Sequence, residues 1–247
     1  PKLPALAEAK ELQVKIIEKP TIATAISIGH PLSVNRSDDD FYLLALANSA
    51  LGQHRTFEGR LMRSMRQIRG LNYGDYSYVE NFMQEDSMSV WMRPNIPRRQ
   101  QYFSIWIRPV PHTKAVFALR EALFELDQFV EKGLSEEEFE GTRNYLFNYT
   151  KLYAQTGSQR LGYDIDGKFY GKKSYIQELA ERLPTMTRDQ VNAAIKKHIQ
   201  AKNLFVSMVT EDGKALHDAI VSKKPSPFGE TKDLPENVIA ENKIIES

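Results

Sequence analysis

The sequence predicts an α+β fold, in which helices pack on one face of a mixed, mainly antiparallel β-sheet. Two observations support this prediction. Short runs alternate apolar and polar residues with the period of two of a half-buried strand, while longer runs repeat apolar residues at helical spacing. The order of these patterns is two strands, two helices, three strands and then a series of helices, which favours an antiparallel sheet with segregated helices.

The first third of the chain contains two strand patterns followed by two helix patterns. The strands lie in KELQVKIIEKP and TIATAISIGHP, and in the second of these Ile22, Thr24, Ile26 and Ile28 fall on one side. The first helix begins after an N-cap at Ser37 or Asp38, and Gly52 is its expected stop. The second helix, at residues 57–69, has an apolar face surrounded by arginines and ends at Gly70.

The middle of the chain predicts three more strands, at residues 71–82, 87–93 and 101–108, and then a long amphipathic helix at 114–132. The next helix is expected at 135–155, because Ser135 and Glu138 have the spacing of a capping box. Two further helices are predicted, at 174–183 and after Thr187, and NLFVSMVTED is a late strand.

The segment GYDIDGKFYG is interpreted as a loop, in which Asp164 and Asp166 flank one buried isoleucine and do not form a catalytic carboxylate pair. Residues 1–222 are predicted to form a single domain. The proline-rich, polar residues 223–247 are predicted to be an extended tail.

The composition is that of a soluble globular protein and weakens several functional interpretations. Of 247 residues, 41% are hydrophobic and 26% charged, which suffices for a large core. Lys+Arg 33 nearly balances Asp+Glu 32, whereas nucleic-acid-binding domains usually carry a basic excess. The absence of cysteine excludes disulfides and thiolate zinc sites, and no apolar run approaches the ~18 residues of a membrane span. Because the chain begins at Pro1, we expect it to be part of a longer protein.

No complete catalytic set can be found among the residues. The histidines are not paired as a helical zinc-protease motif requires, and His54 with Glu58 supplies only two of the three ligands needed. His30 is expected at a strand end and His198 near a helix C-terminus, where a cation suits the helix dipole. Serine-nucleophile, phosphate-loop and dinucleotide motifs are absent.

One stretch does suggest a binding site: MRSMRQIRGLNYGDYSY. Arg66 lies in the last turn of its helix, and Tyr73 begins the strand after the glycine stop, so the two side chains can converge. Arg66 could then donate forked hydrogen bonds to a carbonyl or carboxylate, and Tyr73 could add a phenolic donor. The alternative is that Arg66 solvates the helix end and Tyr73 packs on the sheet. We expect the other arginines of this helix to lie on its solvated face: Arg60, Arg63 and Arg69.

The order of motifs resembles the second-half domain of the pitrilysin/insulinase-type zinc peptidases, the family that includes the mitochondrial processing peptidases. The likeness lies in Leu51-Gly52, Arg60-Leu61, Met65-Arg66 and Gly70-Leu71-Asn72-Tyr73. Two weaker motifs follow in the expected order, EKGLSEEEFEGTRNYL and MTRDQVNAAIKKHI, so that the resemblance covers roughly residues 10–212.

The resemblance implies an α/β-roll half-domain of an enzyme whose two halves close around a peptide. In that family one half holds zinc on an HxxEH helix, and the other supplies an arginine and a tyrosine seven residues apart that hold the substrate. Arg66 and Tyr73 match those positions, whereas HxxEH is absent from this sequence. The chain therefore resembles the non-zinc half, inactive when isolated, with zinc in a partner half and the bacterial periplasm as an implied compartment. A non-catalytic scaffold or peptide-binding subunit is the alternative.

Overall fold

The computed structural model of this chain describes residues 3–6, 8–53, 58–81, 97–229 and 232–247. Within them a single sheet has the strand order β1-β5-β2-β4-β3. Its strands are β1 (Gln13–Glu18), β2 (Thr24–Leu32), β3 (Asp75–Tyr78), β4 (Gln101–Val110) and β5 (Phe205–Thr210). The β1–β5 pair is parallel and the other three pairs are antiparallel, which confirms the predicted mixed, mainly antiparallel sheet.

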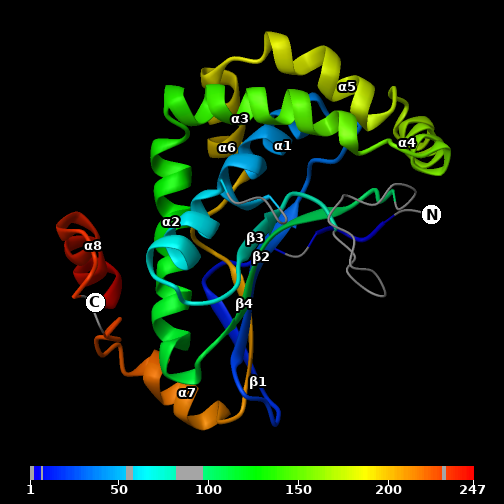
Figure 1. Ribbon diagram of the computed structural model, residues 1–247. Coiled ribbons are helices and arrows are strands. Elements are labelled where there is room, and N and C mark those ends of the chain that lie inside the picture. The colour runs from blue at the N-terminus through cyan, green and yellow to red at the C-terminus, as the bar shows by residue number, and fades with distance from the viewer. Residues whose placement is uncertain (1–2, 7, 54–57, 82–96, 230–231) are drawn as a thin grey trace.

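The helices gather on one side of this sheet and beyond one of its ends (Figure 1). They are α1 (Asp39–Gly52), α2 (Ala115–Lys132), α3 (Glu136–Tyr149), α4 (Gly157–Tyr170), α5 (Tyr175–Arg182), α6 (Arg188–His198), α7 (Gly213–Val221) and α8 (Glu236–Glu246). A π-helical segment, η1 (Met62–Ile68), precedes β3. None of the helices in the described part of the chain is both long and apolar enough to cross a membrane.

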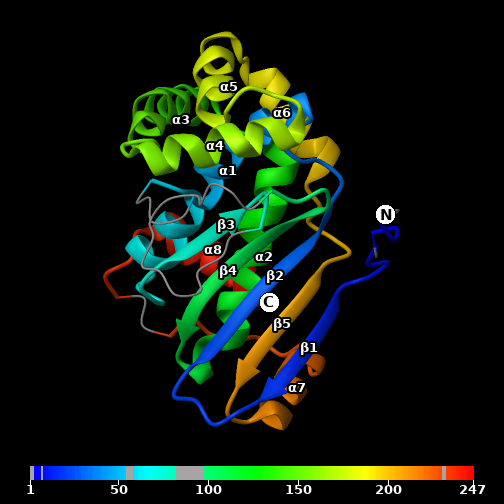
Figure 2. The ribbon, with the colours of Figure 1, turned by 90° about the vertical axis from the view of Figure 1, so that its right-hand side faces the viewer.

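The core lies between the sheet and these helices. Alternate residues of β2, β4 and β5, including Ile28, Ile105 and Met208, are buried there with Ala122 and Leu126 of α2. The residues between them point to the opposite face, because side chains alternate along a strand. Figure 2 shows this second face, which no helix of the described residues covers over most of its area. We call it the open face.

Several predicted local signals are confirmed. Ser135 caps α3 in a capping box with Glu138, and Gly52 is the last residue of α1. His198 lies in the last turn of α6, as expected from its position. Asp38 is the N-cap residue of α1, although its carboxylate accepts a bond from the backbone of Asn35 instead of from the helix.

The loop predicted around Asp164 and Asp166 is wrong. These residues lie in α4, which begins with a capping box between Thr156 and Gln159. Ile165 is 44% exposed, whereas Asp166 is buried and pairs with Arg36 at 3.4 Å. The Thr-x-x-Gln spacing was a sequence signal for this helix.

The expectation of an extended tail is also wrong for residues 236–246. They form α8, whose Val238, Asn242 and Ile245 are buried and which packs against α2. The division into residues 1–222 and 223–247 stays a prediction. The strand predicted at residues 87–93 lies outside the described residues.

Candidate functional site

The segment that carries Arg66 is a short helix with an enforced end. Residues Met62–Ile68 have π-helical bonding, a feature that often marks functional sites. The helix stops where Gly70 adopts a φ of 60°, and the Gly70 N–H donates to the Arg66 carbonyl at 2.9 Å. This left-handed conformation favours glycine, so the predicted stop at Gly70 is confirmed.

A turn anchored by Asn72 then positions Tyr73. The side-chain amide of Asn72 donates to Asp75 at 2.7 Å and to the carbonyl of Arg108 at 2.9 Å, and its oxygen accepts the Gly74 N–H at 2.9 Å. These three bonds fix the backbone on both sides of Tyr73. Its side chain remains 78% exposed, so a held backbone presents a phenol to solvent.

The structure brings the two predicted residues together. The Arg66 guanidinium carbon lies 5.9 Å from the centroid of the Tyr73 ring, within the range of a cation–π contact. Arg66 is half-buried, and its Nη1 lies 3.9 Å from the sulfur of Met62. A forked cationic donor and a phenol are therefore adjacent at the edge of the open face. Their role in holding a substrate stays a prediction.

Two neighbouring arginines are not on a solvated face, contrary to expectation. Arg60 donates to both carboxylate oxygens of Glu138, at 2.6 and 2.7 Å, and to the Gly133 carbonyl at 2.7 Å. The side chain of Arg69 is completely buried. Arg63 is exposed, as predicted.

Arg69 forms the centre of a buried polar cluster beneath the site. Its guanidinium donates to Glu121 at 2.8 Å and to Asn242 at 2.8 Å, and it pairs with Glu241 at 2.5 Å. Ser64 donates to the same oxygen of Glu121 at 2.7 Å. This cluster joins η1 to both α2 and α8, so it fixes the segment from which Arg66 projects.

Two buried carboxyls, one in this cluster and one beside the turn of Tyr73, have raised pKa values. Burial raises the pKa of Glu121 to about 7, although the adjacent guanidinium of Arg69 opposes the shift. Burial likewise raises the pKa of Asp75, next to the turn of Tyr73, to about 7. Both side chains are inaccessible to solvent, so we assign them to the interior and not to a substrate-contacting role. The sequence patterns did not single them out.

Two of the histidines form hydrogen bonds with neighbouring protein groups. His30 lies within β2, and its ring bonds the Pro31 carbonyl at 2.8 Å and the Gln200 N–H at 3.2 Å. His198 contacts Asp40 at 2.7 Å. His54, and with it the pairing with Glu58, lies outside the described residues.

The described residues do not fit a zinc ion. Among them, no group of three or more His, Asp or Glu side chains could hold a metal, and the sequence has neither cysteine nor HxxEH. We therefore assign no metal-dependent step to the described residues.

Aromatic side chains follow the sheet from the site, and the first of them, Tyr76, is buried against Met62. Tyr76 pairs with Trp106 across β3 and β4, with ring centroids 6.3 Å apart, and Arg108 lies 5.9 Å from the Trp106 ring. Directly opposite residues of paired strands share a face, so Tyr76 and Trp106 lie on the open face together. Tyr102 lies further along β4 on the same face, since it too alternates with buried residues.

Comparisons with known proteins agree with this architecture. No family model matches the chain. It is 23% identical over 203 residues to the "non-peptidase homolog YmxG" of Helicobacter pylori, and 24% identical over 212 residues to the "uncharacterized zinc protease SCO5738" of Streptomyces coelicolor. These matches cover 81% and 84% of this chain but 42% of each relative, so the chain spans about two fifths of their length.

A solved structure, the peptidase M16 inactive domain from Pseudomonas fluorescens, is similar over 84% of this chain and 44% of that chain. Its TM-score is 0.64 and its sequence identity 24%. The chain thus has the fold of this peptidase M16 inactive domain, and the resemblance to the pitrilysin-type peptidases that its motifs predict is confirmed.

Proposed function

We propose that this chain is the substrate-binding, non-zinc half of a zinc metalloendopeptidase, in which Arg66 and Tyr73 hold the peptide. The observation that supports the proposal most is the adjacency of these two side chains. The Arg66 guanidinium carbon lies 5.9 Å from the centroid of the Tyr73 ring, and Tyr73 is 78% exposed. Tyr73 stands out from a turn that three hydrogen bonds of Asn72 hold, so its hydroxyl is accessible to a peptide at a fixed position.

The chemistry required of such a pair is positioning. Arg66 can donate two parallel N–H bonds to a peptide carbonyl or carboxylate, and the Tyr73 hydroxyl can donate a third. Fixed donors that face developing negative charge stabilise a transition state, and loss of one such donor costs about 3–4 kcal/mol. Zinc, which activates water and polarises the scissile carbonyl, is proposed to be in the partner half that carries HxxEH.

The test compares variants in the enzyme assembled from this chain and its HxxEH-bearing half. Arg66→Ala and Tyr73→Phe should each lower peptide turnover by about 100- to 1,000-fold, as loss of a transition-state donor does, without changing the zinc content. Arg63→Ala is the matched control, because Arg63 is an exposed arginine of the same helix. Turnover by both variants equal to that of the control would contradict the proposal. We also expect the chain alone to cleave nothing.

A second function is a non-catalytic scaffold or peptide-binding subunit. The name of the Helicobacter pylori relative, a "non-peptidase homolog", supports this candidate. The two functions differ in whether an HxxEH-bearing half exists, in the same parent chain or in a separate subunit. Co-purification of the native assembly, followed by metal analysis, separates them: one zinc per assembly supports the peptidase and none supports the scaffold. The bacterial periplasm is our proposed compartment, from family resemblance alone.

A further inference from the structure

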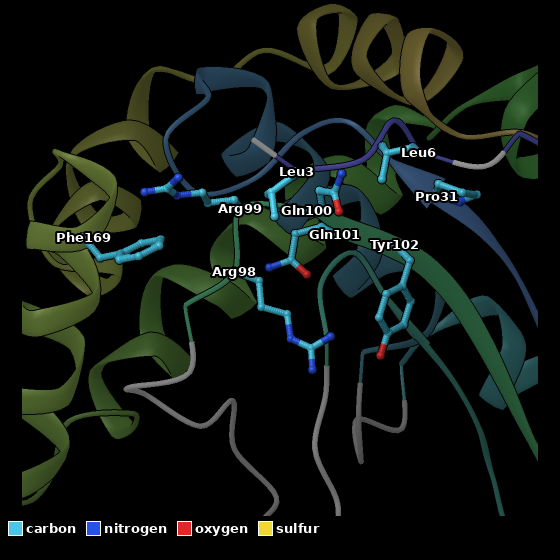
Figure 3. A pocket seen from close by; sticks show the side chains of 9 residues that line it. All are labelled: Leu3, Leu6, Pro31, Arg98, Arg99, Gln100, Gln101, Tyr102 and Phe169. Atoms are coloured by element: carbon cyan, nitrogen blue, oxygen red, sulfur yellow. The ribbon is translucent and has the colours of Figure 1, made fainter. Parts of the chain in front are cut away.

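A second site lies at the end of the open face where β4 begins. It is a pocket of about 620 Å³ lined by Leu3, Leu6, Pro31, Arg98, Arg99, Gln100, Gln101, Tyr102 and Phe169. Figure 3 shows these side chains around an open space, with Phe169 of α4 on one side and Tyr102 and Pro31 on the other. Four segments far apart in the sequence therefore build one concave surface with apolar walls and two cations.

The backbone beside this pocket is held firmly. The Tyr170 hydroxyl accepts the N–H of Arg98 at 2.7 Å and donates to the Arg98 carbonyl at 2.9 Å, and Asn35 donates to the Arg99 carbonyl at 3.3 Å. Gln100 donates to the carbonyl of Pro4 at 2.6 Å, which ties the segment of Leu3 and Leu6 to the pocket. These contacts use only backbone atoms of Arg98 and Arg99.

The guanidinium groups of Arg98 and Arg99 differ from those of the arginines that form ion pairs in the interior. Arg36, Arg60 and Arg69 are each paired with a carboxylate. Arg98 and Arg99 are exposed, and within the described residues neither guanidinium has a carboxylate or other hydrogen-bonding partner. Arg98 and Arg99 are consecutive residues whose guanidinium groups point in different directions (Figure 3), and each offers a cation beside apolar walls. A cation in such a setting complements a carboxylate attached to an apolar group.

The pocket is continuous with the open face. Pro31 and Tyr102 also line a neighbouring groove of about 580 Å³ that follows β2, β4 and β5. From Tyr102, β4 continues toward Trp106 and Arg108, close to the turn that carries Tyr73. The six residue steps from Tyr102 to Arg108 span about 20 Å of strand. An extended peptide of about 12 residues is therefore long enough to contact Arg66 and Tyr73 at one end and the pocket at the other.

We infer that this pocket selects peptides that carry a carboxylate beside an apolar side chain, six or more residues from the part held by Arg66 and Tyr73. Arg98 or Arg99 binds the carboxylate, and Leu3, Leu6 and Phe169 contact the apolar side chain. The inference rests on the proposed function, since it names the substrate class of the same peptide-binding surface. The carboxylate belongs either to an Asp or Glu residue or to a peptide C-terminus.

Binding of fluorescein-labelled peptides to the chain tests this inference by anisotropy. The probes are about 12 residues long, matched to the span above, and end in Phe-Asp-amide, Phe-Asn-amide or Phe-Asn with a free C-terminus. The Asp probe should bind about 10-fold more tightly than its Asn-amide partner, the effect of one charge-assisted contact at an exposed site. A similar gain by the free C-terminus would identify a terminal carboxylate as a second accepted source.

The double variant Arg98→Ala/Arg99→Ala should remove the preference for the carboxylate probes but leave the affinity for the Asn-amide probe unchanged. Arg160→Ala, at an exposed arginine of α4, is the matched control and should keep the preference. Arg98→Glu/Arg99→Glu should reverse the preference toward a Phe-Lys-amide probe. Equal binding of all probes to the unmodified chain, or a preference that survives in the double variants, would overturn the inference.

These outcomes separate this inference from the proposed function. Arg66→Ala should weaken every probe by a similar factor, because it acts at the other end of the peptide. If only Arg66→Ala has its expected effect, the selectivity inference fails and the proposed function stands. If only the Arg98 and Arg99 variants have their expected effect, the selectivity inference is supported and the proposed role of Arg66 fails.

Discussion

Replacing Arg69 with methionine should destabilise the fold far more than the same change at Arg63. Both arginines belong to the same helical segment, but the Arg69 side chain is fully buried and Arg63 is exposed. Arg69→Met keeps most of the side-chain length and removes the guanidinium. Glu121, itself completely buried, then loses the guanidinium that lies 2.8 Å away. In α8, Asn242 loses a hydrogen bond from Arg69 and Glu241 loses its ion pair with Arg69.

The expected magnitude follows from this geometry. Breaking a buried ion pair by removing one partner costs about 3–5 kcal/mol, whereas an exposed arginine contributes about 0–1 kcal/mol. Burial already raises the pKa of Glu121 to about 7, and Arg69 opposes that rise. In Arg69→Met the carboxyl therefore protonates more readily. Because the protonated form needs no counter-charge, the loss should be largest near pH 8 and smaller near pH 6.

Urea denaturation followed by far-ultraviolet circular dichroism at both pH values measures these losses. The double variant Arg69→Met/Glu121→Gln should recover much of the stability, because it no longer buries an unpaired charge. If Arg69→Met loses no more than Arg63→Met at pH 8, then Arg69 is not the buried ion-pair partner that the structure shows.

Three further variants concern one buried carboxyl and two helix glycines. Burial raises the pKa of Asp75 to about 7, above its unfolded value, so stability should fall as pH rises from about 4 to 8. In Asp75→Asn, the decrease in the free energy of unfolding between pH 4 and pH 8 should be smaller by up to about 4 kcal/mol. If the urea midpoint depends on pH in the same way for the variant and the unmodified chain, this prediction is refuted. Gly167→Ala should destabilise α4 by about 1–3 kcal/mol, since its Cβ would lie 2.5 Å from the Lys173 carbonyl. At Gly141 in α3 an added Cβ has no neighbour within 4 Å, so Gly141→Ala should stabilise the protein by about 0.5–1 kcal/mol in thermal unfolding. A stabilising Gly167→Ala or a destabilising Gly141→Ala would contradict the corresponding prediction.

The sequence by itself determined the elements whose signals are local. Strand alternation, the capping box of Ser135 and Glu138 and the stop at Gly70 depend on residues a few positions apart, and the structure confirms them. The seven-residue spacing of Arg66 and Tyr73 is also local, because one helix end and one turn bring these side chains together. Family resemblance could therefore be read from the order of such short motifs.

Only the tertiary structure decided which polar residues are buried. Arg63 and Arg69 look alike in a helical pattern, but Arg69 meets Glu121, 52 residues away, and Glu241, 172 residues away. Asp166 is likewise buried against Arg36, which is 130 residues distant. The pocket of Arg98 and Arg99 draws its walls from four separate segments. The physical reason is that periodicity reports which face of an element is apolar, whereas the burial of a charge depends on a counter-charge that chain folding brings from elsewhere.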